Sequence, residues 1–191
     1  MTYENKLPAG FASRGIDPDN DKKLRVRLYA ASGSAAVLLL GLGCLIKDMS
    51  LMFDASGAFA LLFRFVVVIA LLGATLLGQE YLKCILLGRL TGKPARVVRE
   101  KLSARIEYKC WLDRKSYVIM SLAPAGAICL VLLLFMLILP DKLFWQCYLI
   151  FVVNLVGAAG DAYTAYLLYR EKADVRVKND GYTTLIATEK K

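Results

Sequence analysis

The stretch VIMSLAPAGAICLVLLLFMLIL, residues 118–139, decides the fold of this chain. It contains no charged residue and leaves no polar face for water. About 20 apolar residues of helix, at roughly 1.5 Å each, cross the hydrocarbon core of a bilayer. In lipid a helix satisfies its own backbone groups, whereas an open strand does not. The stretch therefore predicts a transmembrane helix and argues against the core of a soluble helical bundle.

Three further apolar runs of spanning length lie on either side of this stretch. They cover residues 29–46, 58–87 with interruptions after Leu77, and 143–169. The chain of 191 residues is 58% hydrophobic, with a mean hydropathy of +0.50, and its charges lie in blocks between the runs. These features predict an all-α integral membrane protein, with four transmembrane helices in one domain over residues 29–170.

The distribution of lysine and arginine predicts how the chain crosses the membrane. Six basic residues precede residue 29, nine lie in the loop 89–117 and six in the tail from residue 170, but only one lies in each of the segments 47–57 and 140–142. Cytoplasmic segments carry the basic excess. We therefore expect both termini and the loop 89–117 in the cytoplasm. The polar segment 1–28 does not resemble a cleavable signal peptide, so the first run is expected to stay as an anchor.

The formal net charge of +9 raises the question of nucleic-acid binding. Almost all of the basic excess lies beside the expected cytoplasmic face of the membrane. Topology and attraction to anionic lipids explain this placement. The sequence therefore predicts the lipid bilayer as a partner and no nucleic acid.

Two polar segments predict small cytoplasmic β-hairpins. In the loop 89–117, Gly92-Lys93-Pro94 is typical of a helix stop, and residues 95–101 and 103–110 contain alternating stretches. An amphipathic helix on the membrane surface is the alternative for this loop. In the tail 171–191, residues 174–178 alternate, Asn179-Asp180-Gly181 favours a turn, and residues 182–187 favour a second strand.

Ionisable residues inside membrane spans are energetically costly and are candidates for function. The predicted spans hold four: Arg64, Glu80, Lys83 and Asp161. Arg64 lies near the outer end of its span, where its long side chain can reach the membrane surface. The other three cannot reach a surface so easily and need partners within the protein.

Glu80 and Asp161 are expected at the same depth in the membrane. Each precedes a basic residue, Arg89 or Arg170, by nine positions, which corresponds to about 13 Å of helix. Both predicted helices run in the same direction. The small residues at 157–160, 162 and 165 allow another helix to approach closely. Equal depth and close approach predict a shared polar site that includes Lys83.

The segment Gln79-Glu80-Tyr81-Leu82-Lys83 has the frame of the motif HExxH with both histidines replaced. The sequence Leu87-Gly88-Arg89-Leu90-Thr91-Gly92-Lys93 follows it, the next span opens with Leu122-Ala123-Pro124, and the last span carries Asn154 and Gly160-Asp161. In order, spacing and topology the chain resembles the putative zincin peptidases, a family of small bacterial membrane proteins similar to site-2-type proteases. The resemblance covers roughly residues 60–187 and implies a bacterial inner (plasma) membrane location.

In such a family two histidines bind zinc, the glutamate acts as general base, and a carboxylate on the last helix completes the site. The resemblance assigns Gln79 and Lys83 to the two histidine positions, Glu80 to the base and Asp161 to the remaining ligand. The chain contains no histidine, and a protonated lysine repels a metal cation. We therefore expect the zinc site to be lost, leaving a polar cluster of Glu80, Lys83, Asn154 and Asp161.

Three functions remain open from the sequence. The first is a pseudo-metallopeptidase, without a catalytic centre, that binds or sequesters a membrane protein or peptide. The second is an accessory protein for ion movement or transport, because charged residues in a membrane can serve such pathways. The third is a metallopeptidase with the unusual ligands Glu80, Cys84 and Asp161. A homo-oligomer is compatible with each of them.

Overall fold

A computed structural model of the chain describes residues 3–4, 7, 11–16, 21–53, 57–92, 96–100, 103–108, 110–171, 174–179 and 184–189. The predicted hairpin turn at Asp180-Gly181 and the pair Lys93-Pro94 lie outside these residues. Within them, four helical segments are long and apolar enough to cross a membrane, as predicted. They are Lys22–Ile46, Ala58–Thr91, Arg114–Ile138 and Asp141–Arg170.

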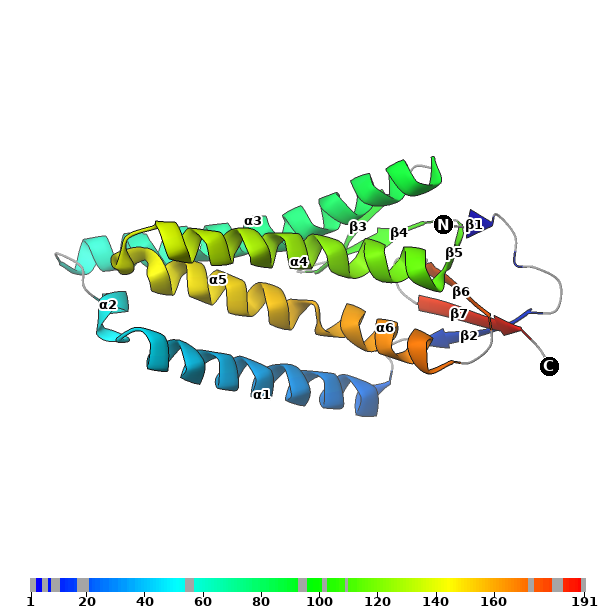
Figure 1. The fold of residues 1–191 in the computed structure, drawn as a ribbon, viewed down its shortest axis with the longest axis horizontal. Helices are drawn as coiled ribbons and strands as arrows, with labels where there is room; N and C mark the ends of the chain where they lie inside the picture. The colour runs from blue at the N-terminus through cyan, green and yellow to red at the C-terminus, as the bar shows by residue number, and fades with distance from the viewer. Residues whose placement is uncertain are drawn as a thin grey trace. The chain divides into compact units, whose positions relative to one another are not determined.

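The first and third membrane-spanning helices are α1 (Lys22–Ile46) and α4 (Arg114–Ile138) (Figure 1). Each begins before its apolar run does. At the start of α1, the Asp21 carboxylate accepts the backbone N–H groups of Lys23 and Leu24 at 3.0 and 3.1 Å. This is the usual geometry of a helix N-cap. Capping therefore lets α1 begin ahead of the hydrophobic run that starts at Tyr29.

The second membrane-spanning helix, α3 (Ala58–Thr91), ends just before Gly92, where the sequence predicted a helix stop. Gly92 has a φ of +64°, in the left-handed region that glycine adopts without steric cost. Its N–H donates to the Gly88 carbonyl at 2.8 Å. A short helix, α2 (Ser50–Phe53), precedes α3.

The fourth span is not the single helix that its apolar run predicted. It consists of a 3₁₀ turn, η1 (Asp141–Leu143), and two α-helices, α5 (Phe144–Gly157) and α6 (Ala159–Arg170). The break falls at Ala158, whose φ and ψ of −78° and 0° lie outside the helical range. Glycines at 157 and 160 flank the break and lower the helix propensity there. As a result, Asp161 lies in the first turn of α6.

Both predicted hairpins are present, and the surface-helix alternative for residues 95–110 is wrong. Strands β3 (Arg96–Glu100) and β4 (Ser103–Glu107) pair in a two-stranded antiparallel sheet. Strands β6 (Val175–Asn179) and β7 (Thr184–Glu189) form the tail hairpin, with Val177 opposite Ile186.

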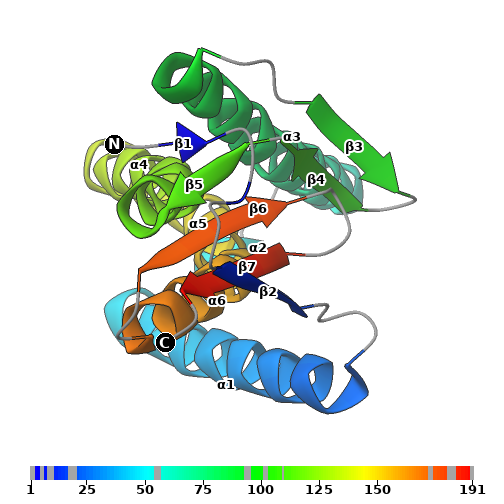
Figure 2. The same cartoon turned by 90° about the vertical axis from the view of Figure 1, so that its right-hand side faces the viewer.

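The tail hairpin belongs to a larger sheet that the sequence did not predict. Strands β1 (Tyr3–Glu4), β2 (Phe11–Ile16) and β5 (Trp111–Asp113) join it. The order is β1-β5-β6-β7-β2, with every neighbouring pair antiparallel (Figure 2). The prediction of an all-α protein with small hairpins is therefore right about the helices and underestimates the strands. Short strands such as β1 are formed by distant partners, and their own sequence carries no strand signal.

The chain forms two compact units, each built from separated segments of sequence. The first unit comprises residues 1–27, 79–124 and 160–191, and the second comprises residues 28–78 and 125–159. All the described strands lie in the first unit. Its core joins the sheet to the ends of helices through Leu87, Ile106, Tyr108, Cys110, Leu112, Tyr117, Met120, Leu168, Val175, Val177 and Ile186.

The second unit is held by aromatic residues of α5 and by close helix approach. Phe144, Trp145, Tyr148 and Val152 are its buried cluster. The Tyr148 hydroxyl donates to the Leu39 carbonyl of α1, and the Trp145 indole donates to the Asp48 carbonyl at 2.9 Å. Elsewhere the helices expose large apolar side chains: Leu45, Phe59 and Leu137 are 82–83% exposed, as expected of surfaces that face lipid.

Candidate functional site

The residues singled out on α3 lie together on one buried face of that helix. Gln79 is 5% exposed and Lys83, one helical turn later, is 7% exposed. Positions four residues apart share a face of a helix. Both residues that replace the histidines of the HExxH frame therefore point into the protein.

Lys83 is the centre of a group of three charges. Its Nζ donates to Glu80 Oε1 at 2.7 Å and to Asp161 Oδ2 at 2.7 Å. The side chains of Lys83, Glu80 and Asp161 are 9%, 16% and 28% exposed. We call these three residues the triad. All of them belong to the first compact unit, and their meeting agrees with the equal depth expected from the sequence.

The helix break places Asp161 at a favourable position for a carboxylate. The first turn of a helix carries unpaired N–H groups and the positive end of the helix dipole, which stabilise a negative charge. Asp161 lies in the first turn of α6, whereas an unbroken helix would have put it in a helix interior. The flanking glycines 157 and 160 are the one sequence signal that could have indicated this.

Two buried tyrosines lie within electrostatic range of Asp161, and sequence reasoning missed both. Tyr108 lies in the loop after β4 and Tyr117 lies near the start of α4, and each is 3% exposed. The Tyr108 hydroxyl has no hydrogen-bond partner among the described residues. Burial raises the pKa of Tyr108 well above its ordinary value, and interactions with Tyr117, Cys110 and the Asp161 carboxylate contribute to the shift. Only the tertiary fold brings these residues to Asp161.

Cys84, the alternative metal ligand considered from the sequence, lies beside the triad and is partly buried. It interacts electrostatically with Glu80 and packs against the core of the first unit. However, the described part of the chain contains no group of three His, Cys, Asp or Glu residues arranged to hold a metal ion. The Lys83 ammonium lies between the two carboxylates that such a site would need.

Asn154, which the sequence placed in the same polar cluster, belongs to the second unit. Its side-chain amide donates to the Ala125 carbonyl at 3.0 Å and to Cys129 Sγ at 2.9 Å. Asn154 is 1% exposed. These bonds join α5 to α4, which is a common role for a buried amide between membrane helices.

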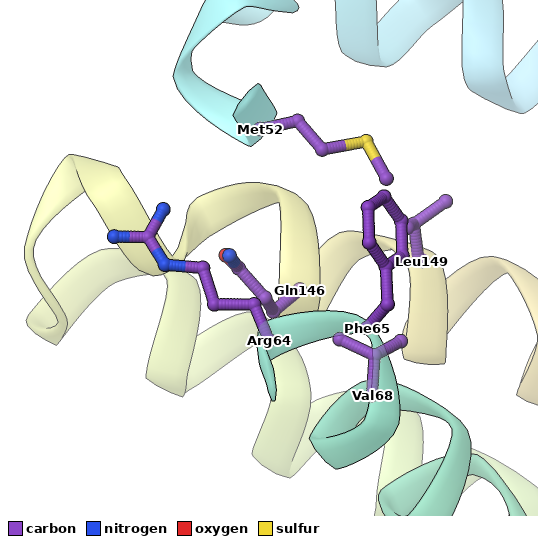
Figure 3. Close-up of a pocket in the computed structure, with 6 residues that line it drawn as sticks. All are labelled: Met52, Arg64, Phe65, Val68, Gln146 and Leu149. Carbon is purple, nitrogen blue, oxygen red and sulfur yellow. The ribbon is translucent and has the colours of Figure 1, made fainter. Parts of the chain in front are cut away.

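Arg64 lines a small pocket of the second unit with Met52, Phe65, Val68, Gln146 and Leu149 (Figure 3). Its guanidinium points away from Phe65 and Leu149. This arrangement fits a long side chain whose aliphatic part covers apolar surface.

A comparison with known protein families finds a match over the region that contains the triad. A family model described as "Putative zincin peptidase" matches residues 73–176, which is more than half of the chain. The matched region includes every member of the triad, together with Tyr108, Tyr117 and Asn154. No curated protein and no solved structure matches the chain significantly.

Proposed function

This chain belongs to the putative zincin peptidase family, and from that premise we propose that it is a pseudo-metallopeptidase that binds a membrane partner without cutting it. The observation that carries the proposal is the position of Lys83. Its ammonium makes contacts of 2.7 Å with both Glu80 and Asp161. By the resemblance to the family, Glu80 corresponds to the general base of the HExxH frame, and Asp161 corresponds to the metal ligand on the last helix.

The side chains present at this site do not fit zinc. A protonated lysine has three donors and no lone pair, so it cannot coordinate a metal. Zinc is bound by thiolate, imidazole and carboxylate groups, and Gln79 supplies none of these. A cation between Glu80 and Lys83 would meet the ammonium charge at short range. The Lys83 ammonium instead supplies the positive charge that the two carboxylates require.

Without a metal the triad serves structure and recognition. Lys83 connects α3 to α6 across 78 positions of sequence, and this connection keeps the carboxylates stable in an apolar surrounding. A zincin-like fold brings a membrane segment close to its centre. With no means of hydrolysing a peptide bond, such a fold would hold or sequester that segment.

We place the protein in the plasma membrane of a bacterium, with both termini and the loop 89–117 in the cytoplasm. The support is the lysine and arginine distribution together with four helices of spanning length among the described residues. In this orientation the five-stranded sheet is cytoplasmic, as are β3 and β4.

The proposal is tested by photocrosslinking in cells. A photoreactive residue at Tyr163 would capture a segment close to Asp161, and a residue at Leu45, on an apolar exposed surface, would serve as the control position. We expect a partner of full length in the crosslink, both in the unaltered protein and in Glu80→Gln. Cleaved fragments that disappear in Glu80→Gln would contradict the proposal.

A second candidate function is an accessory role in ion movement. The observation that favours it is the broken fourth span, with Asp161 immediately after the break, because discontinuous helices with charged residues occur in transporters. Ion flux in proteoliposomes that is lost in Asp161→Asn and kept in Glu171→Gln would support this candidate over partner binding.

A further inference from the structure

The start of α4 and the end of α6 meet within the first unit. The Arg114 guanidinium donates through Nη2 to the Glu171 carbonyl at 2.7 Å, and its Cζ lies 6.0 Å from the centre of the Tyr169 ring. The second distance is in the range of a cation–π interaction. The two helix ends therefore form one local surface, although 57 positions of sequence separate Arg114 from Glu171.

This surface carries an excess of positive charge. Its two segments of chain, 113–115 and 169–172, contain four basic and two acidic residues: Arg114, Lys115, Arg170 and Lys172 against Asp113 and Glu171. Lys115 and Arg170 are exposed, and neither forms an ion pair within the described part of the chain. An excess of one sign of charge attracts a ligand of the opposite sign. We call Arg114, Lys115, Tyr169 and Arg170 the basic surface.

Exposed apolar and aromatic side chains continue from the basic surface along both helices. Ile119 lies one turn after Lys115 on α4, and Tyr166 lies one turn before Arg170 on α6; both are exposed, as is Tyr169. Residues three or four positions apart lie on the same side of a helix. Each helix therefore places an exposed apolar or aromatic side chain beside an exposed basic one.

The order of these groups matches the boundary of a bilayer. Lys115 precedes the apolar run that begins at Val118, and Arg170 follows directly after the run that ends at Tyr169. Both runs belong to helical segments of spanning length. Basic and tyrosine side chains gather where the hydrocarbon core meets the headgroups. A phospholipid presents the complementary order, with its phosphate beside its acyl chains.

We infer that the basic surface binds the phosphodiester headgroup of an anionic phospholipid, whose acyl chains lie along Ile119 and Tyr166. The guanidinium of Arg114 presents a planar fork of N–H donors that suits the oxygens of a phosphate. Its contacts with the Tyr169 ring and the Glu171 carbonyl orient it before the lipid binds, which lowers the entropic cost of binding.

This inference goes beyond the proposed function and does not depend on it. It requires only that the helices cross a membrane, and it concerns neither the triad nor a protein partner. It also differs from a general attraction of basic segments to anionic membranes. A built site distinguishes Arg114 and its neighbours from other basic residues near the membrane, whereas a general attraction does not.

The test measures lipid binding to the full chain in a neutral detergent by native mass spectrometry. The probes are phosphatidylglycerol and phosphatidylcholine with the same acyl chains. We expect a single phosphatidylglycerol to bind about tenfold more tightly than phosphatidylcholine. Arg114→Gln/Lys115→Gln should remove this preference. The matched control is Lys22→Gln/Lys23→Gln, which removes two exposed basic residues at the start of α1 and should leave the preference unchanged.

A second double variant keeps the test independent of folding. Lys115→Gln/Arg170→Gln alters only exposed side chains, so its thermal unfolding without lipid should match that of the unaltered protein. We expect it to lose the preference as well. Arg114→Lys keeps the charge and removes the planar fork, and should retain only part of the preference.

Three results would overturn the inference. The first is equal affinity for the two lipids. The second is an equal loss of preference in Arg114→Gln/Lys115→Gln and in Lys22→Gln/Lys23→Gln, because the attraction would then be a general effect of charge. The third is displacement of phosphatidylglycerol by millimolar inorganic phosphate, because the surface would then take a free anion.

Discussion

Lys83 Nζ and Asp161 Oδ2 lie 2.7 Å apart although 78 positions of sequence separate them. The ion pair joins the middle of the chain to its last helical segment. It is formed within one compact unit, between helices whose carboxylates were expected at one depth. We expect the stability of the protein to depend on this contact, and the proposed loss of the zinc site rests on it.

The first prediction concerns the stability of the triad. Lys83→Met should lower the free energy of unfolding by about 3–5 kcal/mol, because it removes the ammonium that lies between two partly buried carboxylates. Asp161→Asn should cost less, since Glu80 still pairs with Lys83. The double variant should recover part of the loss, and a double-mutant cycle on the reconstituted protein measures this coupling.

The matched control for Lys83 is Lys47, whose ion pair with Asp141 is exposed. That pair has a distance of 2.8 Å, and its side chains are 35% and 67% exposed. Lys47→Met should therefore change stability by less than about 1 kcal/mol. Strictly additive effects of Lys83→Met and Asp161→Asn would show that the two residues do not interact.

The second prediction concerns the packing of α1 on α5 in the second unit. A Cβ atom at Gly43 would collide with the Tyr148 ring, so Gly43→Ala should destabilise the protein by about 1–3 kcal/mol. Gly41 lies in the same helix, and a Cβ atom there would meet nothing within 4 Å among the described residues. Gly41→Ala should be neutral or slightly stabilising. Equal effects of the two variants in thermal unfolding would contradict this packing.

The third prediction uses the buried phenol of Tyr108. Its pKa is raised in the folded protein because of burial, so folding is favoured fully below the unfolded value of about 10 and progressively less above it. Stability should therefore fall as the pH rises above about 10, and Tyr108→Phe should reduce the fall. At neutral pH, Tyr108→Phe should cost little, because the hydroxyl that it removes has no partner among the described residues. An unchanged pH profile in Tyr108→Phe would contradict the raised pKa.

The fourth prediction is the orientation of the chain in the membrane. Reporters fused after Lys191 or inserted within residues 96–110 should read as cytoplasmic, and reporters within residues 50–56 should read as external. Paired phosphatase and fluorescent-protein fusions give the two opposite readouts. A cytoplasmic signal at Ser50 would overturn the four-span arrangement.

The sequence predicted the helices and the triad because both depend on local rules. Apolar length identifies spans, and a helical rise of about 1.5 Å per residue places Glu80 and Asp161 at one depth. A charge that is costly in lipid must have a partner. These rules are sufficient to predict the contact of Lys83 with both carboxylates.

Most of the features that could not be predicted from the sequence depend on contacts between distant segments of the chain. Strand β1 has two residues and exists because Tyr3 and Glu4 pair with Leu112 and Trp111. Tyr108 lies in a polar loop, and only the fold brings it within electrostatic range of Asp161. The break at Ala158 interrupts an apolar run without changing its hydropathy, so a pattern based on hydropathy alone treats the run as one helix.

The zinc content of the purified protein tests most directly whether Lys83 takes the place of a metal. The measurement compares zinc per chain in the purified protein and in Gln79→His/Lys83→His, which restores the HExxH frame. We expect well under one zinc per chain in the unaltered protein. The double variant should approach about one, and Asp161→Ala should remove that zinc. A stoichiometric zinc in the unaltered protein that is lost in Glu80→Ala and Cys84→Ala would contradict the account.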